Sequence, residues 1–265
     1  MTAGEDYLEK CRGLVEAVAS QQEAIARTAD LFSKTIIDGK LVHLFGSGHS
    51  RIPAEEMWPR YGSFPGFHPI VELSLTYHNQ VVGANGQRQA MFLENVTGLA
   101  EKILRNFDIS EQDSALVISS SGCNVVPVEM AQCFQERGLK VVAILGRQHM
   151  DACDSRHPDG KKLADFADIV LDTGIPPGDS MTRVEGLGEP VCRTFGSGAP
   201  RSYAPGTGVD ARLSARRLPG PRDAALGRYD PTERPPETPR AGPESPRPRP
   251  RRRAPQDQPT RGRRR

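Results

Sequence analysis

Short, mostly apolar runs alternate with helical segments along residues 40–172, and this alternation constrains the fold more than any other feature of the sequence. The runs occupy residues 40–45, 69–73, 114–119, 140–145 and 168–172, and each has the length of a buried strand. Helical spacing of apolar residues is found at residues 98–107, 124–137 and 161–166. Strands that alternate with helices form a parallel sheet covered on both faces. The sequence therefore predicts an α/β fold, a three-layer αβα sandwich with a five-stranded parallel sheet of flavodoxin-like type.

Helices are also expected in the first hundred residues. Apolar residues recur at roughly helical spacing across residues 5–37, which predicts one long helix ending before the Asp38-Gly39 turn. Residues 51–58 are expected to form a short helix with Pro53 in its first turn, where proline is tolerated. Further helical pieces are expected around residues 91–96.

The composition changes near residue 192. Residues 193–265 contain 18 arginines, no lysine, 7 acidic residues and 14 of the 23 prolines, so this part has a net charge of +11, whereas residues 1–192 have a net charge of −9. With one valine (Val209) and no isoleucine, it has too little apolar surface to offset the entropy lost on ordering. We therefore expect a folded domain over residues 1–192 and a disordered Arg/Pro-rich tail over residues 193–265.

Two explanations of this tail are considered. Arginine without lysine, together with abundant proline, glycine and alanine, is what G+C-rich codons encode when read out of frame, so we hypothesise a frameshift near Cys192. The alternative is a genuine basic tail that binds nucleic acid by neutralising its phosphates. Because only Phe195, Tyr203 and Tyr229 could stack on bases, nucleic-acid binding is the weaker interpretation.

The rest of the chain lacks the sequence features of several functional classes. Its longest unbroken apolar run, residues 141–145, is too short for a transmembrane helix, and its charged N-terminus has no hydrophobic segment of a secretory signal. The 5 cysteines are widely spaced without a C-x-x-C pair, which favours reduced thiols in a cytoplasmic protein. No nucleotide-binding P-loop is present. Gly46-Ser47-Gly48 half-matches the dinucleotide motif, but the bulky Arg51 stands where a small residue is needed, so no cofactor is expected.

Serine-rich turns follow two of the predicted strands. Residues 46–50 (GSGHS) follow the first run, and residues 119–124 (SSSGCN) follow the third. Ligands of open parallel sheets bind beyond the carboxyl ends of the strands. Hydroxyl groups beside a helix N-terminus can hold an anion such as phosphate without a lysine. Serine and glycine also form ordinary turns and caps, but two such loops at neighbouring strand ends favour a binding site.

The order of these elements and motifs resembles the sugar isomerase (SIS) domain, a phosphosugar-binding fold. Residues 46–72, which include PAEEMWPRYGSFPGFHPIVE, are similar to a little-characterised bacterial branch of that superfamily, and the resemblance extends over residues 5–192. It implies that the chain binds a phosphorylated sugar, a carbohydrate derivative, as a phosphosugar isomerase or lyase. The alternative within the family is a non-catalytic phosphosugar-sensing or regulatory module. The resemblance also implies homodimers or tetramers with sites shared between subunits.

The resemblance also implies roles for individual residues. In SIS proteins one loop contacts the sugar and a second loop holds its phosphate. The matching residues of the sugar loop are Ser47 and Ser50, and those of the phosphate loop are Ser119, Ser120, Ser121 and Asn124.

Isomerisation needs a base that moves a proton between adjacent carbons and a group that stabilises the carbonyl oxygen. Glu55 and Glu56 are adjacent on the predicted helix and point about 100° apart, so at most one faces the site. Glu56 is expected to be the base because its position resembles the family's functional helix position, and His49 is the second catalytic candidate. His68 and His78 are placed in loops of unknown depth.

No metal is expected at this helix. In SIS heptose-phosphate isomerases a histidine and a glutamate on it serve a metal, whereas Glu56 and Arg60 stand at the matching places here. The aromatic residues nearby, Trp58, Phe64 and Phe67, are expected to pack against the protein rather than to stack on a sugar.

SIS domains usually continue beyond the part matched by residues 185–191 into a final helix that covers the sheet. The sequence departs from this pattern at about Cys192. We therefore expect an exposed apolar patch on the sheet near residues 168–171.

The frameshift hypothesis predicts that one of the other two reading frames after codon 192 encodes an amphipathic helix. Translation of the gene in those two frames is the measurement. If neither frame restores an apolar helix, the result counts heavily against a frameshift.

Overall fold

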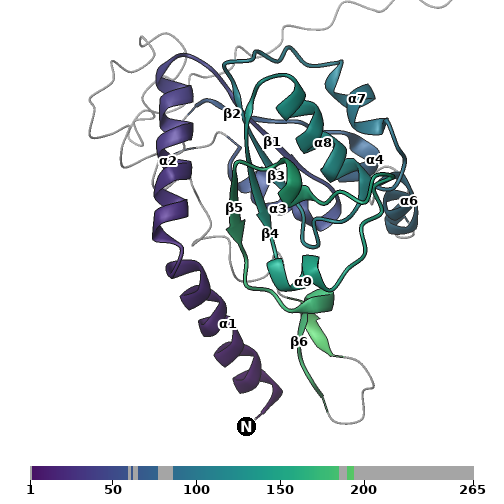
Figure 1. Cartoon of the computed structure of the whole chain (residues 1–265). Helices are drawn as coiled ribbons and strands as arrows, with labels where there is room; N and C mark the ends of the chain where they lie inside the picture. Colours follow the sequence, from purple (N-terminus) through teal and green to yellow (C-terminus); the bar gives the residue numbers. More distant parts are fainter. Residues whose placement is uncertain (1, 59–60, 62–64, 77–85, 185–189, 194–265) are drawn as a thin grey trace, which may run out of the picture. The chain divides into compact units, whose positions relative to one another are not determined.

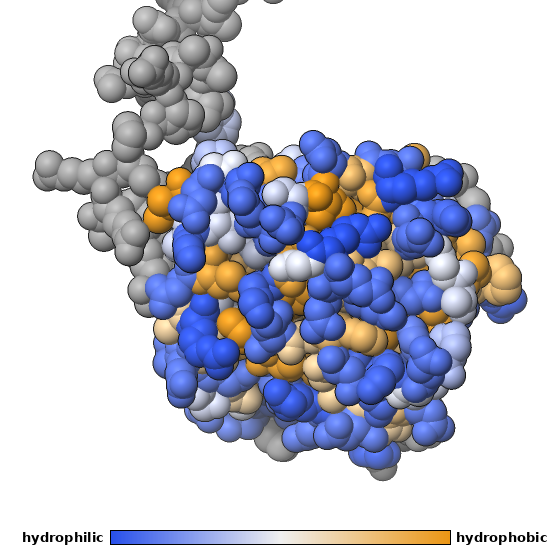
Figure 2. All heavy atoms as spheres, turned by 45° about the horizontal axis from the view of Figure 1, so that its top comes forward, coloured by the Kyte–Doolittle hydropathy of each residue, from blue (hydrophilic) through white to orange (hydrophobic). Residues whose placement is uncertain are grey.

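The computed structural model describes residues 2–58, 61, 65–76, 86–184 and 190–193 of the chain. Within these residues a central sheet is flanked by helices on both faces (Figure 1). Hydrophilic side chains cover most of the described surface shown in Figure 2, with hydrophobic ones interspersed. No helix within the described ranges is both long and apolar enough to cross a membrane.

The central sheet has five parallel strands, as the sequence predicts. In spatial order they are β2 (Phe67–Pro69), β1 (Val42–Gly46), β3 (Ser114–Ile118), β4 (Lys140–Leu145) and β5 (Ile169–Asp172). Their carboxyl ends lie at one edge, where Gly46 is paired in register with Ile118 and Leu145 with Asp172. The strand β2 begins two residues before the predicted run and is only three residues long.

Helices cover the two faces and so make three layers. One face carries α1 (Ala3–Ala19), α2 (Gln22–Ile37) and α3 (Arg51–Glu56); the other carries α4 (Leu73–Thr76), α6 (Gly86–Leu93), α7 (Leu99–Leu104), α8 (Val125–Glu136) and α9 (Arg147–Asp151). Figure 1 shows α1 and α2 on one side of the strands and α7 and α8 on the other. The predicted αβα sandwich is confirmed.

The strands are apolar throughout because both faces of the sheet are buried. On β3, Ala115 and Val117 belong to the core beneath α7 and α8, whereas Leu116 and Ile118 belong to the core beneath α2 and α3. Successive side chains of a strand point to opposite faces, so a strand covered on both faces needs an unbroken apolar run rather than an alternating one. For this reason the strands could be predicted from short apolar runs in the sequence.

The predicted long helix over residues 5–37 is divided into α1 and α2. Gln21 has a non-helical backbone conformation at the junction. Its side-chain Nε2 donates to the carbonyl oxygen of Asp172 at 2.7 Å, and the Asp172 N–H donates to its Oε1 at 2.8 Å. The break therefore directs one amide side chain to the backbone of the edge strand β5.

The expectation of an exposed apolar patch near residues 168–171 was wrong. Ile169 and Leu171 are both buried and pack in the same core as Val18 and Phe32. The helices α1 and α2, which precede the sheet in the sequence, cover this face of β5. A final helix after residue 192 is therefore not needed to bury these two side chains.

Several short elements complete the described chain. Single 3-10 turns occur at η1 (Gly48–Ser50), η2 (Leu163–Phe166) and η3 (Pro177–Asp179). A separate two-stranded antiparallel sheet pairs β6 (Ser180–Thr182) with β7 (Val191–Arg193). The segments β6, β7 and α9 could not be predicted from the sequence, because they are too short to show a hydrophobic period.

Two histidines and an aspartate form a hydrogen-bonded row near the amino ends of the strands. His43 Nδ1 lies 3.0 Å from His68 Nδ1, and His43 Nε2 lies 3.1 Å from Asp113 Oδ2. His43 is fully buried and stacks on Phe134, and His68 makes an edge contact with Phe107. The row joins β1 to the edge strand β2, and His68 lies away from the serine-rich turns.

The electrostatic environment shifts the pKa values of two members of this row. Burial, reinforced by His43 and opposed by Asp113, lowers the pKa of His68. Burial would raise the pKa of Asp113, but hydrogen bonds from the backbone N–H groups of Leu41 and Ser110 and from His43 lower it. The carboxylate of Asp113 is therefore ionised at neutral pH and accepts these bonds.

The His68 pKa predicts that the protein loses stability in mild acid. The folded pKa lies below the ordinary value of 6.5, so the unfolded chain binds this proton more readily than the folded protein does. The free energy of unfolding therefore decreases as the pH falls from the ordinary His pKa toward the folded pKa. Urea unfolding of the wild type and of His68→Gln at a series of pH values between 8 and 5 is the measurement. The variant, which lacks the titrating group, is expected to show the smaller decrease; equal decreases would contradict the assignment.

Candidate functional site

The chain leaves the carboxyl ends of the adjacent strands β1 and β3 toward opposite faces of the sheet. After β1 the chain enters α3 on one face, and after β3 it enters α8 on the opposite face. The two loops therefore diverge from adjacent strand ends, since Gly46 is paired with Ile118. In open parallel sheets this divergence leaves the crevice in which ligands bind.

The loop after β1 is a tight turn that requires glycine at its start. A Cβ on Gly46 would lie 2.3 Å from the carbonyl oxygen of Ser50, so only glycine allows this approach. Ser47 is buried, whereas His49 is exposed on η1. The Arg51 guanidinium closes the turn by donating from Nη1 to the carbonyl of Gly48 at 3.2 Å.

The loop after β3 presents three hydroxyl groups in one turn before α8. Ser119 Oγ accepts from the Gly122 N–H at 3.1 Å, and Ser121 Oγ accepts from the Cys123 N–H at 3.3 Å. A hydroxyl that accepts in this way keeps its own proton as a donor. The turn therefore holds these serines in fixed positions and leaves each with a proton to donate.

The third hydroxyl of this turn contacts a histidine that the sequence analysis did not single out. Ser120 Oγ lies 3.2 Å from Nδ1 of His149 on α9. Burial lowers the pKa of His149, and the nearby Asp179 opposes this shift. The imidazole is therefore biased toward its neutral form, in which it can accept from or donate to the serine hydroxyl.

Glu94, directly after α6, joins the two loops. Ser47 Oγ donates to Glu94 Oε1 at 2.6 Å, and Asn124 Nδ2 donates to Glu94 Oε2 at 2.7 Å. The Glu94 carbonyl also accepts from the Val126 N–H at 2.9 Å. One residue thus binds a predicted sugar-loop residue, a predicted phosphate-loop residue and the first turn of α8. Sequence reasoning missed it because a single glutamate in a helical stretch gives no signal of its tertiary contacts.

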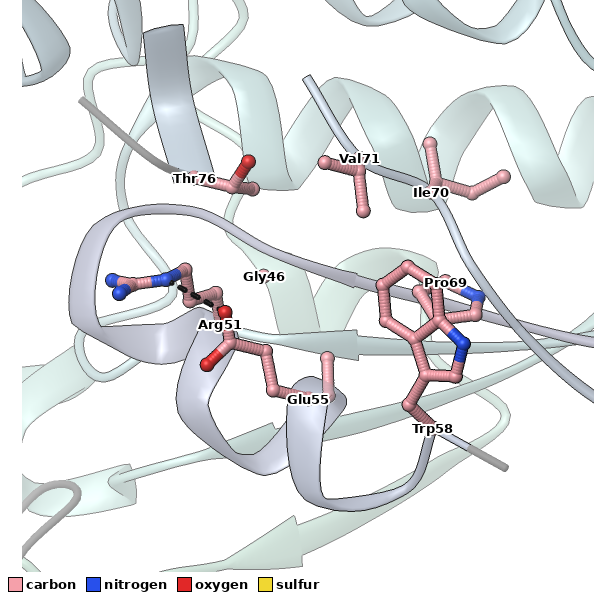
Figure 3. A pocket seen from close by; sticks show the side chains of 9 residues that line it. Gly46, Arg51, Glu55, Trp58, Pro69, Ile70, Val71 and Thr76 are labelled. Carbon is pink, nitrogen blue, oxygen red and sulfur yellow. Dashed lines mark hydrogen bonds and ion pairs between the residues drawn. The ribbon is translucent and has the colours of Figure 1, made fainter. Parts of the chain in front are cut away.

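A shallow pocket opens beside the first loop, between α3 and the chain that follows β2 (Figure 3). It is open to solvent and is lined by Gly46, Arg51, Ala54, Glu55, Trp58, Pro69, Ile70, Val71 and Thr76. Arg51 Nε donates to Glu55 Oε1 at 3.1 Å within it. The Trp58 side chain is about half exposed, at 47%. The pocket therefore combines the ion pair of Arg51 and Glu55 with one aromatic side chain.

The structure brings some of the predicted site residues together and leaves others apart. Ser47 and Asn124 meet at Glu94, and Ser119, Ser120 and Ser121 share one turn. Ser50 lies at the end of η1 on the first loop.

The two predicted catalytic residues are both exposed. Glu56 ends α3 as an exposed residue, and its neighbour Glu55 is the one that lines the pocket. His49 is exposed on η1, and His78 falls outside the described residues. No group of three or more His, Cys, Asp or Glu side chains suited to a metal ion was found in the part of the chain that the structure describes.

Comparisons with known proteins give the chain's relatives. A family model described as the SIS domain matches residues 6–146. A UPF0309 protein of Halalkalibacterium halodurans is 37% identical over 169 residues, which are 64% of this chain and 67% of the relative. A UPF0309 protein of Listeria innocua is 35% identical over 179 residues, which are 67% of this chain and 70% of the relative.

Solved structures with a similar arrangement include two phosphoheptose isomerases. The one from Neisseria gonorrhoeae is 18% identical, with a TM-score of 0.46, and covers 67% of this chain and 90% of its own. The one from Francisella tularensis is 16% identical, with a TM-score of 0.47, and covers 81% of this chain and 97% of its own.

Removal of the Glu94 carboxylate is expected to destabilise the protein. Glu94→Ala leaves the buried Ser47 hydroxyl and the Asn124 amide without their acceptor, at a cost of about 2–3 kcal/mol in the free energy of unfolding. Glu94→Gln keeps one acceptor oxygen and is expected to lose less. Urea unfolding measures both variants against Glu101→Ala, a truncation of an exposed glutamate on α7. A loss no larger than that of the control would show that Glu94 does not hold the loops together.

Proposed function

The chain belongs to the SIS domain family, and from that premise we propose that it binds a phosphorylated sugar across the carboxyl ends of β1 and β3. The observation that carries the proposal is the pair of hydroxyl-bearing turns at these two adjacent strand ends, joined through the carboxylate of Glu94. A sugar phosphate has a polyhydroxylated part and a dianionic part, and it needs two different kinds of contact side by side.

The phosphate is assigned to the turn of residues 119–124. Ser119, Ser120 and Ser121 offer three hydroxyl protons at one turn, and the positive end of the α8 dipole lies beside them. Asn124 is the N-cap residue of α8, yet its side chain does not cap the helix and binds Glu94 instead. The turn is therefore organised around something other than ordinary helix capping.

The sugar is assigned to the loop of residues 46–50 and to the pocket beside it. Ser47 and Ser50 stand at the start and end of this loop, and Gly46 is shared between the loop and the pocket wall. The half-exposed Trp58 offers an aromatic face on which a sugar ring can stack. This exposure favours stacking on a sugar over the packing role that was expected from the sequence. Arg51 and Glu55 supply polar contacts in the same pocket (Figure 3).

Catalysis is a separate question from binding. Glu56 and His49 stay the predicted catalytic pair. Glu55, the other carboxylate weighed from the sequence, lines the pocket, and Glu94 is a further carboxylate near the strand ends. An aldose–ketose isomerase needs one such carboxylate within reach of a substrate carbon. Binding without turnover would instead favour the sensing module. Homo-oligomers, a cytoplasmic location and the frameshift after residue 192 stay predictions as well.

Binding of a sugar phosphate is expected to raise the melting temperature of the full chain. A ligand at about 100 times its Kd stabilises the folded state by about 2.7 kcal/mol, which corresponds to about 5–10 °C for a domain of this size. Thermal unfolding is measured against hexose and N-acetylhexosamine 6-phosphates, each compared with its unphosphorylated sugar. Only the phosphorylated members are expected to stabilise the protein.

A pair of serine variants then assigns the binding to the turn. Ser121→Ala removes one donor to a charged group and is expected to weaken binding on the order of 10-fold. Ser20→Ala makes the same chemical change at the end of α1 and is expected to bind as the wild type does. If no sugar phosphate stabilises the wild type, the proposed function fails. If both variants bind equally well, the phosphate is held elsewhere.

A further inference from the structure

The first turn of α8 offers fewer N–H donors than a helix N-terminus usually does. The Val126 N–H is donated to the Glu94 carbonyl at 2.9 Å, and Pro127 has no N–H at all. The Glu94 carboxylate adds a negative charge on the same side of the turn. Few backbone donors are therefore offered to a dianion at the turn, and a positive side chain beside it would strengthen the binding.

The loop of residues 152–162, between α9 and η2, is fixed against the same turn together with the first residue of η2. The Arg156 N–H donates to the carbonyl of Cys123 at 2.9 Å, and the Leu163 N–H donates to the carbonyl of Gly122 at 2.8 Å. Two consecutive carbonyls of the turn are thus bound by the two sides of one loop. This holds the backbone of Arg156 beside the N-terminus of α8.

The Arg156 side chain reaches the residue that begins α8. Its Nη1 donates to Asn124 Oδ1 at 3.0 Å, while Asn124 Nδ2 donates to Glu94 at 2.7 Å. The Asn124 amide is held from both sides, because turning it over would place a donor against Arg156 and an acceptor against Glu94. Arg156 is exposed, so its guanidinium is held at the turn by one N–H and reaches solvent with its other donors.

Positive charge from this loop acts on the turn itself. Burial raises the pKa of the Cys123 thiol, whereas the charges of Lys162 and Arg156 act to lower it, and Asp154 acts to raise it. Lys162 donates to the carbonyl of Met150 at 2.7 Å and so completes the end of α9. Arg156 is therefore the cation of this loop whose side chain contacts the α8 N-cap residue.

We propose that Arg156 recognises the phosphate charge of the ligand, with Asn124 as the positioning residue that holds its guanidinium beside the serine turn. The inference rests on the proposed function and names the group that distinguishes a phosphorylated sugar from a neutral one. A guanidinium suits this task because its planar fork can donate two parallel N–H bonds to phosphate oxygens and stays charged at every physiological pH.

The test measures the affinity of the full chain for inorganic phosphate and for the sugar phosphate that gives the largest thermal shift. Arg156→Gln keeps a polar group of similar reach, and Arg156→Met keeps only the apolar stem, so the pair remains informative if one variant is unstable. Both are expected to bind the two anions on the order of 10-fold more weakly than the wild type. Arg105→Gln, an equal loss of charge at the exposed end of α7, is the matched control and is expected to bind normally.

The outcomes separate this inference from the proposed function. Weaker anion binding in both Arg156 variants, with melting temperatures near that of the wild type without ligand, supports the role of Arg156. Wild-type affinity in the variants would overturn this role while the proposed function stands. A loss of melting temperature without a loss of affinity would show that Arg156 only stabilises the loop. A wild type that binds no phosphate and no sugar phosphate would overturn both proposals.

Discussion

The parallel pairing of β1 with β3 determines where the candidate site lies. Parallel strands finish at one edge of the sheet, so the loops that follow β1 and β3 start side by side even though 76 residues of sequence lie between Gly46 and Cys123. The two loops then turn to opposite faces, and the space between them is occupied at its base by the carboxylate of Glu94. Backbone geometry thus places the two loops side by side, and one carboxylate joins them.

Charge is distributed unevenly around this crevice. Glu94 places a negative charge at the base, where it accepts from Ser47 and Asn124, and Arg156 places a positive charge on the far side of Asn124. An anion is repelled from the base and attracted toward the outer side of the serine turn. A neutral polyhydroxylated group has no such preference and can lie over the first loop. For a ligand bound as we propose, this arrangement would orient the negatively charged end toward Arg156.

Much of the fold could be predicted from the sequence, because buried parallel strands require unbroken apolar runs and their ends require small residues such as Gly46 and Gly122. The two serine turns could be found for the same reason. Glu94, Arg156 and His149 could not, because each acts through a partner distant in the sequence and none belongs to a local motif.

The choice between Glu55 and Glu56 depends on the rotation of a six-residue helix, which one turn of sequence does not determine. The division at Gln21 was missed because glutamine is a good helix former, and its contact with β5 outweighs that preference.

The contact between Gln21 and Asp172 also limits how copies of this chain can associate. An edge strand with unsatisfied backbone groups invites a strand from another molecule to extend the sheet. Here a glutamine amide imitates the next strand at Asp172, by giving one hydrogen bond and taking one. At the opposite edge β2 is only three residues long. Extension of the central sheet from one molecule into the next is thereby disfavoured at both of its edges.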